Sequence, residues 1–329
     1  MTDLKKNVPE LRFPEFEGEW EEKKIKQLFK VVSGSTPLRS NSNYYDNGNV
    51  PWVKTTDLNN AIITQTSEKI TEEAVQKLKL KVLPKNTLLI AMYGGFNQIG
   101  RTGLLQIEAA TNQAISALLE MGDTNSKFFQ AYLNFNVKKW HRVAASSRKD
   151  PNITKKDIEN FKILNTSIKE QNKIGDFFVK LDRQIELEEQ KLALLEEQKK
   201  GYMQKIFSQE LRFKDDNGND YPEWEEKRFL DLFKVIPSKD KQINSRDVLE
   251  NGRFPVVDQG KKLFLGYSNE KSKVIENFEN LIIYGDHTTI IKRINEPFII
   301  GGDGVKLLTG IDEKPINYLF VLLQYFNFC

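Results

Sequence analysis

The sequence predicts an α+β protein in which two homologous domains are joined by one long helix of coiled-coil type. Three observations support this fold class: a stretch of sequence recurs about 200 positions later, a heptad pattern lies between the two copies, and short β-type runs alternate with polar loops. A chain of 329 residues is long enough to form two hydrophobic cores.

The internal repeat is the most informative feature of the chain. Residues 19–31 (EWEEKKIKQLFKV) and 223–235 (EWEEKRFLDLFKV) are identical at nine of 13 positions, at a constant offset of 204. Leu-Arg-Phe opens both halves, at 11–13 and at 211–213. A period this long excludes a solenoid and indicates two copies of one domain. The second copy is predicted to be incomplete, because some 65 residues at the end of the first copy have no counterpart before Cys329.

These patterns predict three parts of the chain. The first domain is expected over 1–165, the long helix over 166–210, and the second domain, incomplete at its C-terminus and lacking a second helix region, over 211–329.

The long helix is predicted from its start signal and its apolar spacing. Ser167-Ile-Lys-Glu170 has the form of a capping box, in which the hydroxyl and the carboxylate each bind an amide of the first turn. Eight apolar residues then recur at spacings of 4 and 3 and form a predicted seam: Ile174, Phe178, Leu181, Ile185, Leu192, Leu195, Tyr202 and Ile206. Residues 169–208 carry eight basic and eight acidic side chains, so we expect a spacer or a partner-docking helix rather than one that tracks phosphates.

The composition excludes several classes of protein. Hydrophobic residues make up 39% and charged residues 29%, and 49 Lys and Arg against 46 Asp and Glu leave a net charge of +3, which excludes a histone-like polycation. No apolar run is long enough to span a membrane and the N-terminus has no signal core, so a cytoplasmic location is expected. One cysteine, Cys329, and two distant histidines, His141 and His287, argue against a zinc site, and no cofactor is expected in this chain.

Catalytic motifs are absent from the sequence. The chain contains no GxxxxGK[ST], no GxGxxG and no Pro-Pro, which argues against an ATP site, a dinucleotide site and an amino-methyltransferase. Asp312-Glu-Lys314 has the shape of half a nuclease metal site, and a metal-dependent nuclease therefore remains a lesser alternative. The sequence favours a binding protein over an enzyme.

Positive charge is concentrated locally, as expected of a nucleic-acid interface. Residues 138–157 carry seven Lys or Arg against two acids, and include a small basic loop that suits phosphate contacts. Two polar loops, 33–45 and 94–101, carry Asn, Gln and Arg, the residue types that read base edges. The predicted DNA-contacting residues are Thr36, Arg39, Lys54, Asn97, Gln98, Arg101, Ser146, Ser147, Arg148 and Lys149 in the first copy, and Gln259, Lys261, Lys262, His287, Lys292 and Arg293 in the second. Each residue alone is equally well explained as an ordinary loop group, and the prediction depends on the cluster.

Several segments together resemble one known family. They are Ser33-Gly-Ser-Thr-Pro37, Tyr44 to Val53 with Asp57, Leu88 to Gly95, Asn112-Gln113, the loop SSRKDPNITKKDIENFKI from Ser146 to Ile163, and the helix start IKEQNKIGDFFVKLD from Ile168 to Asp182. With the two-domain architecture, they make the chain similar to the DNA specificity (S) subunit of type I restriction–modification systems.

The resemblance implies a function without catalysis in this chain. Each domain would be a target recognition domain that reads one half of a bipartite site in double-stranded DNA. The helices would set the spacing and dock methyltransferase (M) subunits, a restriction (R) subunit would join for cleavage, and catalysis would belong to those partners. The unpaired seam also predicts self-association through the long helix. The main alternative is a non-enzymatic coiled-coil scaffold for protein assembly.

Overall fold

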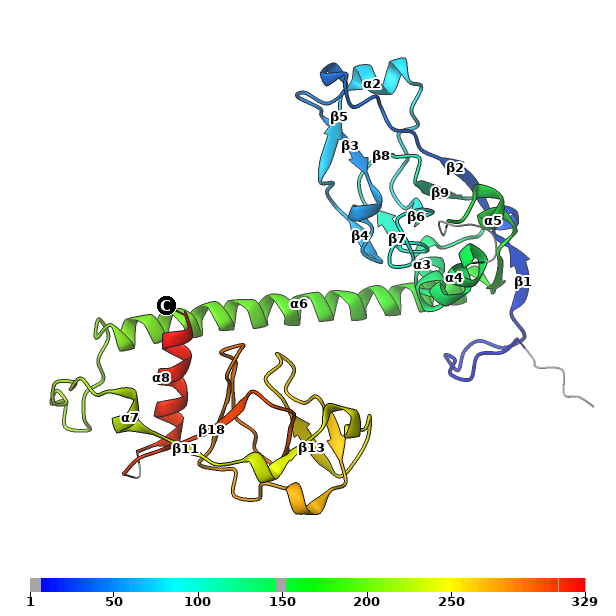
Figure 1. Ribbon diagram of the computed structural model, residues 1–329. Helices are drawn as coiled ribbons and strands as arrows, with labels where there is room; N and C mark the ends of the chain where they lie inside the picture. Colours follow the sequence, from blue (N-terminus) through cyan, green and yellow to red (C-terminus); the bar gives the residue numbers. More distant parts are fainter. Residues whose placement is uncertain (1–6, 146–151, 313, 329) are drawn as a thin grey trace, which may run out of the picture. The chain divides into compact units, whose positions relative to one another are not determined.

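The computed structural model describes residues 7–145, 152–312 and 314–328, and the chain forms two compact units, 1–190 and 191–329 (Figure 1). Both units are mixed α and β, as predicted. The division between the units lies inside the long helix, and the domain limits at 165/166 and 210/211 stay predictions. Ser146, Ser147, Arg148 and Lys149 lie outside the described residues.

The first unit is built on two sheets. Its elements are β1 (Glu21–Lys24), α1 (Ile25–Leu28), β2 (Phe29–Ser33), β3 (Val50–Val53), β4 (Ala61–Ile63), β5 (Glu68–Ile70), α2 (Glu72–Lys77), β6 (Leu88–Ala91), β7 (Thr102–Leu105), β8 (Ala110–Thr111), β9 (Ile115–Glu120), α3 (Ser126–Phe135), α4 (Val137–Ala145), α5 (Lys155–Asn160), β10 (Lys162–Asn165) and α6 (Ile168–Phe207). One sheet has the order β2-β9-β6-β7-β4, the other β5-β3-β8, and β1 pairs with β10 as a two-stranded ribbon.

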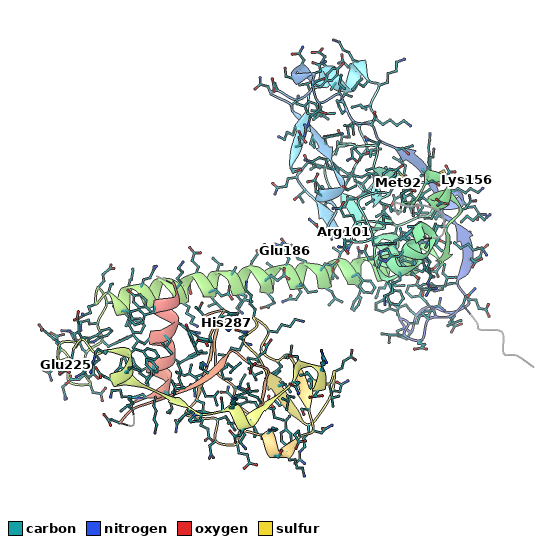
Figure 2. The ribbon with its side chains drawn as sticks, viewed as in Figure 1. Met92, Arg101, Lys156, Glu186, Glu225 and His287 are labelled. Atoms are coloured by element: carbon teal, nitrogen blue, oxygen red, sulfur yellow. The ribbon has the colours of Figure 1, made fainter. Side chains whose placement is uncertain are left out.

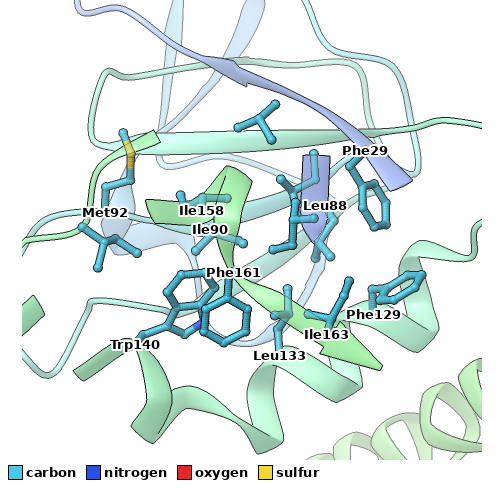
Figure 3. Packing of buried hydrophobic residues seen from close by; sticks show 14 of the residues in the cluster. Phe29, Leu88, Ile90, Met92, Phe129, Leu133, Trp140, Ile158, Phe161 and Ile163 are labelled. Carbon is cyan, nitrogen blue, oxygen red and sulfur yellow. The ribbon is translucent and has the colours of Figure 1, made fainter. Parts of the chain in front are cut away.

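The main core of the first unit lies between the larger sheet and helices α3 to α5. Strand residues such as Leu88 and Ile90, both fully buried, contact a helical layer centred on Trp140 (Figure 3). The Trp140 ring stacks on Phe161 at a centroid distance of 3.8 Å, and Phe29 meets Phe129 edge-on at 5.1 Å. Central strands buried on both faces explain the continuous apolar runs in the sequence.

The long helix α6 forms over residues 168–207, close to the predicted limits. Ser167 Oγ accepts a hydrogen bond from the amide of Glu170 at 3.3 Å, as the capping prediction requires. A capping box would have the Glu170 carboxylate bind a backbone amide at the helix start. In the structure the carboxylate instead binds the side chains of Arg12, Thr166 and Trp20. Gln171 adds a second attachment, because its Oε1 accepts from the Asn125 amide at 2.9 Å and so joins α6 to the start of α3.

The second unit repeats the strand order of the first. Its elements are α7 (Phe229–Leu232), β11 (Phe233–Ile236), β12 (Gln242–Ile243), β13 (Phe254–Val257), β14 (Gly266–Ser268), β15 (Ile282–Gly285), β16 (Ile291–Lys292), β17 (Ile299–Gly301), β18 (Val305–Gly310) and α8 (Ile316–Phe328). The order β11-β18-β15-β16 corresponds to β2-β9-β6-β7, and β14-β13-β17 corresponds to β5-β3-β8. Register agrees as well: Val31 pairs with Leu118, and Val235, 204 positions later, pairs with Leu308. The repeat in the sequence is therefore a repeat of the fold.

The predicted seam of α6 is exposed along most of its length. Ile174 packs against the core of the first unit and Ile206 is half-buried, but the six residues between them are all exposed: Phe178, Leu181, Ile185, Leu192, Leu195 and Tyr202. None of the helices in the described ranges is long and apolar enough to cross a membrane.

Candidate nucleic-acid interface

The loop between β6 and β7 is held in a defined shape by its glycines and by one buried side chain. Ile99 is almost fully buried in the main core and anchors the loop near its end. Gly95 and Gly100 have φ of +79° and +80°, a region that residues with a Cβ rarely adopt. A Cβ on Gly100 would lie 2.7 Å from Cδ1 of Trp140, so only glycine allows the loop to pass this close to the core. The loop is therefore a fixed platform for the polar side chains it carries.

Three polar side chains of this loop were predicted to read bases. Contacts among the described residues do not occupy them. Asn97 is exposed, Gln98 and Arg101 are half-buried, and within the described ranges none of the three side chains makes a hydrogen bond or an ion pair. Figure 2 shows Arg101 and Met92, which flank the loop beside strands β7 and β6. Amide and guanidinium groups without internal partners can form bidentate bonds with adenine and guanine edges.

Two aromatic side chains of the same loop were missed by the sequence reasoning. Tyr93 and Phe96 are 42% and 47% exposed, one on each side of the Gly94-Gly95 pair. Large exposed aromatic side chains beside polar groups are typical of binding surfaces, where they stack on or wedge against a partner. The signal in the sequence was the placement of aromatics in a glycine-rich turn, where no core could cover them.

The loop lies against helix α4, which brings positive charge to it. Phe96 meets His141 edge-on with ring centroids 5.8 Å apart. Lys138, Lys139 and Arg142 belong to the same helix, and none of them is buried. Residue types that suit base readout and cations that suit phosphate contacts thus lie on adjacent elements.

A second cluster forms where β3 ends. Arg39 and Lys54, both predicted to contact DNA, pair with Glu68: the Lys54 Nζ lies 3.1 Å from Oε2, and Arg39 binds the carboxylate with two guanidinium nitrogens. The hydrogen bond from Arg39 and the contact with Lys54 lower the pKa of Glu68 despite the opposing effect of burial. Arg39 also lies 4.5 Å over the Tyr45 ring. Because Arg39 is exposed, its pair with Glu68 is expected to contribute little to stability.

The turn at residues 112–114 connects the two clusters. Thr36 donates its hydroxyl hydrogen bond to the Gln113 side chain. The next carbonyl, that of Ala114, accepts from the amide of Met92 at 2.8 Å, directly before the glycine loop. Thr36 and the β6–β7 loop therefore lie on the same edge of the unit, although 55 or more residues separate them in the sequence.

The second unit gathers its predicted residues in the same way. Gln259 Oε1 accepts from the amide of His287 at 3.3 Å, and the Asp286 amide donates to the Gly304 carbonyl at 2.8 Å. Three loops, after β13, β15 and β17, thus converge at one edge. Lys261 and Lys262 are exposed beside them, as is His287 (Figure 2).

Lys292 and Arg293, which were also predicted to contact DNA, both bind groups within the second unit. Lys292 is 6% exposed and its Nζ lies 3.0 Å from the Asp258 carbonyl and 2.5 Å from the Lys262 carbonyl. Arg293 binds the side chain of Asn317 and the carbonyl of Glu279, and so fixes the start of α8. Basic residue type alone gave no indication of the burial of Lys292, which lies on strand β16 where it pairs with β15.

The metal-site alternative concerns the segment from Asp312 to Lys314. In the part of the chain that the structure describes, no group of three or more His, Cys, Asp or Glu side chains is placed to hold a metal ion. Asp312 lies on an exposed turn, with its carboxylate 3.8 Å from the Lys314 ammonium.

The duplicated fold presents polar and basic loops at one edge of each copy, an arrangement typical of binding proteins with two related domains. Residues 17–197 match the family described as type I restriction modification DNA specificity domain. The chain is 24% identical over 338 aligned residues to the type I restriction enzyme MjaIX specificity subunit of Methanocaldococcus jannaschii, covering 93% of this chain and 76% of that one. It is 26% identical over 174 residues to the EcoR124I/EcoR124II specificity subunit of Escherichia coli, covering 52% of this chain and 43% of that one. The crystal structure of an S subunit from M. genitalium superposes with a TM-score of 0.61 at 17% identity, over 93% of this chain and 77% of that one.

The family match covers more than half of the chain, and the fold is shared nearly end to end. The chain therefore belongs to the type I restriction–modification DNA specificity family and is a specificity subunit, as the resemblance predicted.

Proposed function

We propose that this subunit recognises a bipartite site in double-stranded DNA, with the first unit reading one half-site and the second unit the other. The observation that carries the proposal is the repeated edge of converging loops, 94–101 in the first unit and 259–262 with 286–289 in the second, on two copies of one strand order. Helix α6 would act as the spacer, since 40 residues make a helix of roughly 60 Å. Base-edge contacts would come from Asn97, Gln98 and Arg101, and phosphate contacts from the cations of α4.

In this proposal the chain acts with partners and performs no catalysis itself. Methyltransferase subunits and a restriction subunit would supply the chemistry, and this subunit would confine methyl transfer to the chosen sequence. The exposed apolar seam of α6, from Phe178 to Tyr202, supports docking of a partner helix, because contiguous apolar surface of this kind is rarely left in water. The place of action would be the cytoplasm.

The decisive experiment is single-molecule methylation mapping of DNA from cells that co-express this chain with its modification subunit. A bipartite asymmetric methyladenine motif is the expected result. A bipartite palindrome would mean that only the first unit reads DNA and that two copies pair. No new methylation, with the modification subunit shown to be active, would contradict the proposal.

Two alternatives predict different outcomes in simple assays. A coiled-coil scaffold predicts no salt-dependent binding to any DNA. A nuclease that uses Asp312 and Lys314 predicts magnesium-dependent cleavage by the chain alone. Self-association through the α6 seam predicts dimers in light scattering at micromolar concentration, and a strictly monomeric chain would dismiss it.

A further inference from the structure

The side-chain amide of Gln259 has its orientation fixed by the backbone around it. Gln259 lies in the loop after β13, and its Oε1 accepts a hydrogen bond at 3.3 Å from the backbone amide of His287, in the turn after β15 (Figure 2). A backbone N–H can pair only with the oxygen of a carboxamide, so this bond determines which end of the side chain is Oε1 and which is Nε2. The Thr288 hydroxyl also donates to the Gln259 carbonyl at 2.7 Å and holds the backbone at this position.

The Gln259 side chain lies in a space that two glycines leave open. A Cβ on Gly304 would lie 2.8 Å from Nε2 and 3.0 Å from both Cδ and Oε1, so the carboxamide occupies the place that a side chain at this position would take. A Cβ on Gly285 would lie 3.0 Å from the Cβ of Gln259. Larger residues at these two positions would therefore displace the amide.

The first unit has no equivalent space. Strand register makes Ala91 the counterpart of Gly285, since each is the last paired residue of its strand. An amide-to-carbonyl bond before the last strand of each sheet makes Ala114 the counterpart of Gly304. At the offset of the repeat, the corresponding side chain after β3 is that of Thr55. The two units therefore present different groups at this edge.

The loop that carries Gln259 is tied down on both sides of that residue by one buried cation. The Nζ of Lys292, which is 6% exposed, donates to the carbonyl of Asp258 at 3.0 Å and to that of Lys262 at 2.5 Å. A loop fixed in this way loses little conformational freedom when it binds a partner.

The N–H groups of Nε2 are what Gln259 can offer to a partner. Within residues 7–145, 152–312 and 314–328, Nε2 makes no hydrogen bond, and the exposed Lys261 and Lys262 follow in the same loop. In the major groove guanine and thymine present acceptors, at O6 and N7 and at O4, whereas cytosine presents the N4 donor. A bidentate contact with adenine would require the amide oxygen as well, and Oε1 is engaged by His287.

We propose that Gln259 is a specificity-determining residue: it donates from Nε2 to a base acceptor in the major groove and so selects guanine or thymine at one position of the half-site read by the second unit. The inference rests on the proposed function, because it requires that this unit reads DNA. It predicts a reversal of base choice. Gln259→Glu keeps the shape of the side chain and an oxygen for the His287 amide, but presents an acceptor in place of the donor. The variant should therefore select cytosine or adenine, whose amino groups donate.

The first test is methylation mapping in cells that co-express the modification subunit with the natural chain, Gln259→Glu or Asn251→Asp. We expect Gln259→Glu to exchange guanine or thymine for cytosine or adenine at one position, on the strand that the amide contacts. This position should lie in the half of the motif that Arg101→Ala leaves unchanged. Asn251→Asp is the matched control, because it makes the same amide-to-carboxylate change at an exposed position of the same unit and should leave the motif unaltered.

Binding titrations on duplexes with base analogues identify the contacted strand and atom. The analogues are 7-deazaguanine and 2-aminopurine in place of guanine, and 5-methyl-2-pyrimidinone in place of thymine. The analogue that lacks the accepting atom should weaken binding of the natural chain about fivefold, the effect of one neutral hydrogen bond. The Gln259→Ala chain, which has no donor to lose, should bind the natural and the analogue duplex equally well. Circular dichroism verifies that both Gln259 variants remain folded.

The outcomes separate this inference from the proposed function. A motif that Gln259→Glu leaves unchanged, a change that Asn251→Asp reproduces, or an analogue penalty that persists in Gln259→Ala would overturn the role of Gln259 and leave DNA recognition intact. If Gln259→Glu methylates no site, the analogue titrations with Gln259→Ala decide. A palindromic motif would show that the second unit reads no DNA and would overturn the inference. No methylation by the natural chain, with an active modification subunit, would overturn the proposed function and this inference with it.

Discussion

Arg12 and Glu170 lie 158 residues apart and form a two-bonded ion pair, with Nε–Oε1 and Nη2–Oε2 distances of 2.7 Å each. The Glu170 side chain is 1% exposed and that of Arg12 12%. The pair fastens the N-terminal segment to the first turn of α6, and so attaches the helix to the first unit.

Removal of Arg12 is expected to destabilise the first unit strongly. Arg12→Ala leaves a carboxylate of 1% exposure without its cation, so we expect a clear loss in the free energy of unfolding. Arg183→Ala is the matched control, because Arg183 pairs with Glu186 on the exposed surface of α6, where such a pair contributes under about 0.5 kcal/mol. Differential scanning calorimetry of the two variants measures the difference, and equal melting temperatures would contradict the assigned role of Arg12.

The same pair predicts a pH dependence. Burial raises the pKa of Glu170, but the hydrogen bonds from Arg12 and Thr166 and the charge of Arg12 outweigh this effect, so that the pKa lies below its usual value. A carboxyl whose pKa is lower in the folded state stabilises the fold above the unfolded pKa of about 4.3, and this contribution is lost as the pH falls through the folded pKa. The stability advantage of the natural chain over Glu170→Gln should therefore be full near neutral pH and shrink below about pH 4.3. Urea unfolding at several pH values measures it, and an advantage that grows in acid would refute the assignment.

The glycine loop offers a test of its fixed shape. Gly100→Ala should lower the melting temperature and weaken DNA binding, because its Cβ would lie 2.7 Å from the Trp140 ring at a φ of +80°. Gly95→Ala is the control: it has a similar φ of +79° but no atom within 4 Å of the added Cβ, so only backbone strain of about 1 kcal/mol is expected. If the two variants were equally stable, close packing against Trp140 would not be what requires glycine.

The repeat, the strands and the long helix could be predicted from sequence because each arises from local periodicity or from direct identity between segments. The positions of charged side chains could not. Glu68 neutralises Arg39 and Lys54 because strand β5 pairs with β3, and Lys292 is buried because strands fold over it. The ion pairs of Glu68 and the burial of Lys292 both depend on contacts between segments that are distant in sequence. The positions of basic residues in the sequence do not reveal such contacts. Asn97, Gln98 and Arg101 lie on a glycine-rich loop without internal partners among the described residues, and their contact with DNA stays a prediction.

Base readout and phosphate contact should separate in two variants of the first unit. Arg101→Ala should relax the base preference at one position of a half-site, with a change of about 1–3 kcal/mol in discrimination. Lys138→Ala, which removes a cation of α4, should weaken binding to all sequences alike and reduce the salt slope by about one. Binding titrations on matched and mismatched DNA at several salt concentrations measure both effects. Equal losses on every DNA for the two variants would refute the division of roles.

In the second unit, removal of Lys292 should lower stability, whereas removal of Lys261 should weaken DNA binding. Burial lowers the pKa of Lys292, and its ammonium is held by the carbonyls of Asp258 and Lys262 with the Asp258 carboxylate 3.6 Å away. Lys292→Ala leaves these buried oxygens without a donor, so we expect a loss of about 2–3 kcal/mol in the stability of the second unit. Lys261→Ala removes an exposed side chain and should leave stability within about 0.5 kcal/mol while it reduces the salt slope of DNA binding. Denaturant unfolding and salt-dependent binding of both variants decide the matter. An unchanged unfolding midpoint for Lys292→Ala, together with a reduced salt slope, would return Lys292 to the DNA-contacting residues, because a cation that serves only the fold cannot release counterions from DNA.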